Sequence, residues 1–271
     1  MGSPFGFRLG APSYVFPADI VPNVVRLGPH VDDVELLLFE VNSPRDLPSA
    51  ETANELRALA REYALSYTVH LPLDLALAAP DEKRRRASVA TARSAIAATC
   101  GLDPFAYVIH VRGDDATQTP GNGASEAWLD RAARSLGALT GEVADADRLA
   151  VENLVDCPPS WAAALAERCT ISRCLDVGHV LKGGGDPVAA LRDALPHLRV
   201  VHLHAAVDGR DHLGLPDLDR GLLRTMIGTL ETGGFRGVVT VETFAEVPFF
   251  DSLEILDGLA REIDRRGEEE R

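Results

Sequence analysis

The most informative segment of the chain is ISRCLDVGH at residues 171–179, together with its neighbours RLAVENL at 148–154 and LRVVHLH at 198–204. Each is a short run rich in Val, Leu and Ile that closes with His, Asp or Glu at or near its end. The stretches between them are long enough for one helix each. Short β-rich runs that alternate with helical stretches are typical of βα units and a parallel sheet.

Five further runs extend this pattern over the whole chain. The eight runs lie at residues 5–14, 31–40, 66–73, 106–113, 148–154, 171–179, 198–204 and 235–244. Two of the intervening segments, 49–64 and 125–141, have helical periodicity, and the second begins with a serine N-cap and ends in a glycine. We therefore predict a single (β/α)8 TIM barrel over residues 1–271, with a short charged tail at about 262–271.

A doubly wound open sheet has the same alternation of strands and helices. It normally carries a glycine-rich phosphate loop after its first strand. Here the corresponding turn reads GAPSYVFP, at residues 10–17, and lacks the G-x-G-x-x-G pattern. The closed barrel is therefore favoured.

Composition narrows the class of protein further. The chain has 271 residues and a formal net charge of −14, with a pI near 5.0. This charge opposes broad binding to nucleic acid, which needs a basic surface. The four cysteines show no C-x-x-C spacing, so we expect reduced thiols. Because neither a signal peptide nor an apolar run of membrane-spanning length is visible, we expect a cytoplasmic protein with no membrane contact.

Polar residues with metal-binding side chains end the predicted strands from the third to the eighth. In strand order they are His70, His110, Glu152, Asp176 with His179, His202 with His204, and Glu242. In a barrel of this kind the C-terminal ends of the strands converge on one mouth. Strands buried on both faces have no independent reason to place such groups at equivalent positions, because an unpaired buried charge is costly.

Each of these residues has a structural explanation when it is taken alone. His110 fits a core or rim histidine, Glu152 and Asp176 fit helix caps, and Glu40 at the end of the second strand fits the rim as well as the mouth. Their joint occurrence at successive strand ends favours a metal site. Imidazole and carboxylate suit zinc, manganese or iron, and more than four such groups indicate two or three divalent ions.

The same segments resemble the xylose-isomerase-like barrel superfamily that includes endonuclease IV, and the resemblance spans all eight strands. The matching motifs are VHLP around His70, VIHV around His110, VEN at Glu152, LDVGH with Asp176 and His179, LRVVHLH, GRDHLG, and VET at Glu242. The series resembles the trinuclear ligand set of endonuclease IV. It departs from that set where Arg210, Asp211 and His212 replace a D-x-H element, which weakens the third metal position. The family pattern matches His202 better than His204 as the direct ligand.

The resemblance implies roles for these residues. Glu152 would bridge two ions, with His70 and His110 on one and Asp176, His202 or His204, and Glu242 on or near the other. His179 and His212, helped by Asp211, would complete a third ion or bind phosphate, and Arg210 would steady a phosphate oxygen. The implied catalytic residues are Glu152, Asp176, Glu242 and Arg210.

The segments GAPSYVFPADIVPNV at residues 10–24 and VELLLFE at 34–40 resemble the cobamide-remodelling phosphodiesterases within this superfamily, as does HLH followed by GRDHLGL. That resemblance implies hydrolysis of the nucleotide-loop phosphodiester of a cobamide, a small-molecule substrate, with no nucleic-acid partner.

Three alternatives remain open at this point. A sugar isomerase or epimerase needs one metal on a Glu, Asp, His, Glu quartet, which this chain also provides, and two carboxylates that move a carbon-bound proton. An abasic-site hydrolase like endonuclease IV fits the ligand set but not the acidic charge. A barrel without metal that acts as a binding module is the third. Metal identity and oligomeric state are left undetermined by the sequence.

Overall fold

The structure is a computed structural model that describes residues 3–39, 47–113, 125–157 and 159–269. In this part of the chain, eight parallel strands close into a barrel in the order β1-β10-β7-β6-β5-β4-β3-β2. The strands are β1 (Arg8–Pro12), β2 (Asp33–Leu37), β3 (Ser66–His70), β4 (Ala106–Ile109), β5 (Leu149–Glu152), β6 (Ser172–Asp176), β7 (Leu198–Leu203) and β10 (Val238–Val241). The predicted (β/α)8 barrel is confirmed.

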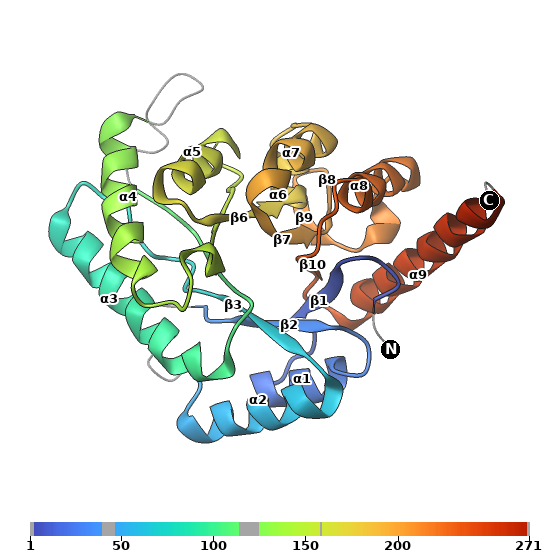
Figure 1. Cartoon of the computed structure of the whole chain (residues 1–271), viewed down its shortest axis with the longest axis horizontal. Coiled ribbons are helices and arrows are strands. Elements are labelled where there is room, and N and C mark those ends of the chain that lie inside the picture. The colour runs from blue at the N-terminus through green and yellow to red at the C-terminus, as the bar shows by residue number, and fades with distance from the viewer. Residues whose placement is uncertain (1–2, 40–46, 114–124, 158, 270–271) are drawn as a thin grey trace.

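Helices surround the barrel on the outside, as Figure 1 shows. They are α1 (Ile20–Leu27), α2 (Ala50–Tyr63), α3 (Glu82–Thr99), α4 (Glu126–Thr140), α5 (Pro159–Cys169), α6 (Val177–Lys182), α7 (Pro187–Ala194), α8 (Arg220–Thr232) and α9 (Glu246–Glu269). Within the described ranges, four short 3-10 helices lie at Cys100–Leu102, Ala146–Arg148, Leu195–His197 and Leu215–Asp217. Both helices predicted at 49–64 and 125–141 are present, and the hydroxyls of Ser49 and Ser125 cap them by accepting backbone N–H bonds.

The observed strands are mostly shorter than the predicted runs, and one pair of strands was not predicted. The sixth strand stops at Asp176, because its carboxylate accepts the amide of His179 and starts helix α6 there. The charged stretch at about 262–271 was expected to be a helix end, and the last helix, α9, extends through it to Glu269. A short antiparallel hairpin of β8 (Ala205–Val207) and β9 (Arg210–Leu213) follows the seventh strand and was not predicted.

The barrel interior changes character along its axis. Its middle contains small or slender apolar side chains, Ala106, Val108, Ala150, Cys174 and Val200. Phe105 packs against this cluster, and the guanidinium groups of Arg8 and Arg199 lie 3.8 Å and 4.3 Å from the centre of its ring. Because side chains alternate along a strand, Ala150 and Glu152 share the inward face of β5, and the polar strand ends therefore lie above an apolar middle. No helix in the described residues is long and apolar enough to span a bilayer.

Candidate metal centre

The register of the barrel brings the polar strand ends to one level. Asp176 of β6 is paired with His202 of β7, which in turn is paired with Thr240 of β10. Glu152 ends β5 next to Cys174 of β6. The eight barrel strands are parallel, so these side chains meet at the C-terminal mouth of the barrel.

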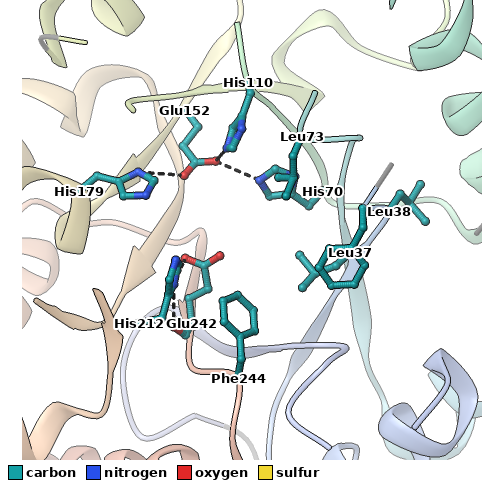
Figure 2. A pocket seen from close by; sticks show the side chains of 11 residues that line it. Leu37, Leu38, His70, Leu73, His110, Glu152, His179, His212, Glu242 and Phe244 are labelled. Atoms are coloured by element: carbon teal, nitrogen blue, oxygen red, sulfur yellow. Dashed lines mark hydrogen bonds and ion pairs between the residues drawn. The ribbon is translucent and has the colours of Figure 1, made fainter. Parts of the chain in front are cut away.

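Glu152 lies between two sets of imidazoles. Its Oε2 is 3.1 Å from Nε2 of His70 and 2.9 Å from Nε2 of His110. Its Oε1 is 3.4 Å from Nδ1 of His202 and 3.6 Å from Nδ1 of His179. The side chain is almost fully buried, and Figure 2 shows His70, His110 and His179 directed at it from different sides. The two oxygens of one carboxylate thus face two different donor sets.

Glu242 is the second point of convergence. Its Oε2 lies 3.4 Å from Nδ1 of His202, 3.7 Å from Nε2 of His204 and 3.5 Å from Nδ1 of His212. Within the described residues, Glu242 Oε2 and His202 Nδ1 are buried and have no hydrogen-bond partner, although they lie 3.4 Å apart. Buried polar atoms are almost always paired, so this set of near but unbonded donors is what a bound cation would complete.

Charge coupling supports the same interpretation. Burial disfavours the charged form of Glu242, but the neighbouring His202 and His212 outweigh it and bring the pKa of Glu242 down to about 2. Burial also opposes a charge on His202, yet the acidic groups around it raise the pKa of His202 well above its ordinary value. Burial lowers the pKa of His110 and keeps its imidazole neutral. In such a cluster a divalent cation can take the place of an imidazolium proton.

Glu35 belongs to the site and was missed from the sequence. It is fully buried inside the barrel, with its Oε2 3.1 Å from Nε2 of His202 and accepting a hydrogen bond from the hydroxyl of Thr240 at 3.3 Å. When Nε2 donates to this carboxylate, Nδ1 of His202 is left facing Glu152 and Glu242. The signal was present in VDDVELLLFE, where Asp33 and Glu35 recur with the period of one strand face.

His204 lies beside His202 in the cluster. Both the histidine within β7 and the one that directly follows it are therefore at the site. Nε2 of His204 is 3.2 Å from Oδ1 of Asp176, and its Nδ1 accepts the backbone N–H of His212 at 2.9 Å. Helix α6 passes directly over this ring. A Cβ on Gly178 would lie 1.8 Å from Cε1 of His204, so LDVGH needs glycine at this position.

The hairpin β8–β9 returns the chain to the mouth. Its turn is Asp208-Gly209, and both residues have positive φ, at 51° and 76°, as a tight two-residue hairpin turn requires. The D-G dipeptide could have revealed this hairpin. It places His212, which itself has a φ of 53°, with its ring stacked on His204 at 4.3 Å.

The three residues of the R-D-H element, Arg210, Asp211 and His212, have different surroundings in the hairpin. Asp211 lies near His179 and His212 but forms an ion pair with Nζ of Lys182 at 2.7 Å. Arg210 is exposed and does not line the cavity at the mouth. The structure thus brings the predicted metal ligands together but not Arg210, and Glu40 lies outside the described residues.

The described residues form several overlapping groups whose ligand atoms lie within 4.8 Å of one another. Groups that share a carboxylate or an imidazole link one end of the cluster to the other. They are His70 with His110 and Glu152, Glu152 with Asp176 and His179, His179 with Asp211 and His212, and His204 with His212 and Glu242. Nitrogen and oxygen donors in this mixture fit zinc, manganese or iron.

Solved structures with the same architecture include enzymes of two kinds. A D-tagatose 3-epimerase-like protein superposes with a TM-score of 0.77 at 18% identity, covering 96% of this chain and 99% of that chain. Endonuclease IV from Thermus thermophilus gives 0.70 at 19% identity, covering 94% and 99%. D-psicose 3-epimerase from Clostridium cellulolyticum gives 0.68 at 17% identity, covering 96% and 99%. At these identities the likeness shows the fold alone.

Sequence comparison gives the family. A search of curated protein sequences finds no match. The family model for the xylose isomerase-like TIM barrel matches residues 23–264, which is most of the chain. The expected superfamily is thereby confirmed, whereas the narrower likeness to cobamide phosphodiesterases is not supported by these comparisons. The chain belongs to the xylose isomerase-like TIM barrel family.

Proposed function

We propose that the protein is a hydrolase that uses two or three divalent metal ions to cleave a phosphodiester. The observation that carries this proposal is the position of Glu152, with one oxygen against His70 and His110 and the other facing His202 and His179. A bridging carboxylate between two donor sets is what a site with more than one ion requires. The Glu152, Asp176, His202 and Glu242 quartet of a one-metal isomerase does not include His70 and His110.

In this proposal the donor sets have separate tasks. His70, His110 and Glu152 would hold one ion, and Glu152, Asp176, His202 and Glu242 a second. His179, His212 and Asp211 would hold a third, for which Asp211 must leave Lys182. When bound, the ions would neutralise phosphate charge and lower the pKa of the attacking water.

The chain's own residues keep these donors in place. Glu35 fixes the ring of His202 from below, and the carbonyl of Leu71 lies 2.8 Å from Nδ1 of His70. Such outer hydrogen bonds orient ligating imidazoles. Asn153 joins the fifth and sixth strands, since its side-chain oxygen accepts the amide of Asp176 and its nitrogen donates to the carbonyl of the same residue. The role of Arg210 on a phosphate oxygen stays a prediction.

The proposal extends to the identity of the phosphodiester that is cleaved. The sequence resemblance points to the phosphodiester of a cobamide, but the structural neighbours are sugar epimerases and endonuclease IV. These favour the alternatives over the cobamide assignment. Among these alternatives, a DNA substrate is disfavoured because the net charge of −14 repels the phosphate backbone.

A sugar epimerase is the second candidate, and a specific observation favours it. Glu152, Asp176, His202 and Glu242 form a quartet at the mouth, and several neighbours with the same fold are named as 3-epimerases of sugars or as similar to one. In this candidate Glu152 and Glu242 exchange a carbon-bound proton. His110 separates the two functions, because it belongs to the proposed ion site formed with His70 and Glu152 but not to the quartet.

The experiment uses the manganese-loaded protein, its His110→Ala variant and a His197→Ala control. His197 is exposed and lines a cavity that contains none of the metal-ligand candidates. Hydrolysis is measured with bis(p-nitrophenyl) phosphate, a cobamide and an abasic-site duplex, and epimerisation with D-tagatose. We expect diester hydrolysis that falls by at least roughly 10- to 100-fold in His110→Ala and is unchanged in the control. Epimerisation that survives His110→Ala, without any hydrolysis, would establish the second candidate instead.

A further inference from the structure

The cavity at the mouth of the barrel has two chemically different walls. Its cavity volume is about 180 Å³, and it is open to solvent. One wall carries the metal-ligand candidates His70, His110, Glu152, His179, His212 and Glu242. The other consists of Leu37, Leu38, Phe39, Leu73 and Phe244; Figure 2 shows Leu37 and Leu38 across the open space from Glu152, and Phe244 next to His212 and Glu242.

The apolar wall is built from the chain that follows several strands. Phe39 comes after β2, Leu73 after β3 and Phe244 after β10. These three large side chains are still 36%, 38% and 39% exposed. Tyr14, after β1, packs edge-on against Phe39 at 4.9 Å and extends the apolar surface outward.

Hydrogen-bonding groups suited to a polyol are missing from this wall. Among the described residues that line the cavity there is no lysine, arginine, serine, threonine, asparagine or glutamine. A group rich in hydroxyls would lose its water there without gaining partners. A flat apolar group would remove both its own surface and the exposed side chains from water.

We propose that this wall is a subsite for an apolar, ring-sized group of the substrate, placed beside the bond that is cleaved. The inference rests on the proposed phosphodiesterase function, since it takes the opposite wall as the place of the phosphoryl group. The substrate is then a phosphodiester with an aromatic or otherwise apolar substituent. A free sugar or a DNA backbone does not match both walls.

Binding of phosphonates tests the subsite without any turnover. Benzylphosphonate and methylphosphonate differ by one ring, and their dissociation constants for the manganese-loaded protein can be compared by calorimetry. We expect the benzyl compound to bind at least about tenfold more tightly. In Phe244→Ala that ratio should fall toward one.

The ratio of the two dissociation constants and a control variant distinguish loss of the apolar subsite from damage to the metal site. Phe244 also contacts the ring of His212 at 4.7 Å, but damage to the metal site would weaken both phosphonates equally and leave the ratio unchanged. Val247, 67% exposed and outside the cavity lining, gives the matched control Val247→Ala, which should keep the wild-type ratio.

A wild-type ratio near one, or a ratio that Phe244→Ala does not change, overturns the subsite whether or not the protein hydrolyses diesters. Failure of both phosphonates to bind speaks against the phosphodiesterase function. The same comparison with phenylacetate and acetate, whose carboxylates also bind metals, then decides the subsite independently.

Discussion

The two ends of the barrel interior both bury carboxylates, but they pair them differently. At the N-terminal end, Asp33 accepts hydrogen bonds from the hydroxyl of Ser66 and the amide of Thr68, and Arg8 donates to Ser66. At the C-terminal end, Oε2 of Glu242 is near three imidazoles and, among the described residues, bonded to none. Asp33 is thus paired with groups of the barrel framework, whereas an oxygen of Glu242 is left unpaired. Convergent, unpaired donors mark the end that a ligand completes.

The largest expected difference between the two ends concerns activity. Glu152→Gln removes the charge that faces both donor sets, and we expect diester hydrolysis to fall by about a thousandfold or more. Asp33→Asn, an isosteric change at the other end, should leave hydrolysis and metal content as in the wild type. Steady-state kinetics and elemental analysis of both variants check this. Equal losses of hydrolysis in the two variants would contradict the proposed difference between the two ends.

A stability measurement examines the N-terminal end alone. Burial raises the pKa of Asp33 to about 7, whereas it ionises near 3.8 when unfolded. Between these values the folded chain holds the proton that the unfolded chain has lost, so the contribution of Asp33 to stability falls as pH rises toward 7. Above that pH the contribution is constant.

Asp33→Asn removes this pH dependence. Relative to the wild type, the variant should therefore gain about 2–3 kcal/mol in free energy of unfolding between pH 5 and pH 8. Urea unfolding of the metal-free proteins at the two pH values provides the comparison. A difference that stays constant with pH would show that Asp33 is ionised throughout.

The smallest expected effect lies where the two regions meet, at Glu35. Glu35→Gln keeps the volume but weakens the hold on Nε2 of His202, so metal affinity should fall by roughly 10- to 100-fold. Competition with a chelating dye measures this affinity directly, and Asp33→Asn is the matched control. A metal affinity equal to that of the wild type would show that Glu35 does not support metal binding.

The sequence was sufficient to predict the barrel because each strand and helix has its own hydrophobic periodicity. The polar residues of the site could be predicted because they lie where the parallel strands end. Glu35 was missed because it lies inside a strand, not at its end. His202 and His204 both fall on the inward face of one strand path. The alternation alone could not show that the two rings approach the carboxylates through different nitrogens, Nδ1 in His202 and Nε2 in His204.

The remaining omissions depend on contacts between distant segments. Gly178 is required by the ring of His204, which lies in another βα unit. The apolar wall is assembled from residues after three different strands. Its members look like ordinary core residues in the sequence, and only the closed barrel reveals that they remain exposed opposite the donors.

The number of metal ions per chain tests the central claim most directly. Elemental analysis of the active protein, purified without chelators and normalised to protein concentration, measures it. The two-sided position of Glu152 predicts at least two ions per chain, with loss of hydrolysis when they are removed and recovery when they are restored. A fully active protein with one ion per chain or fewer would contradict a bridged metal centre.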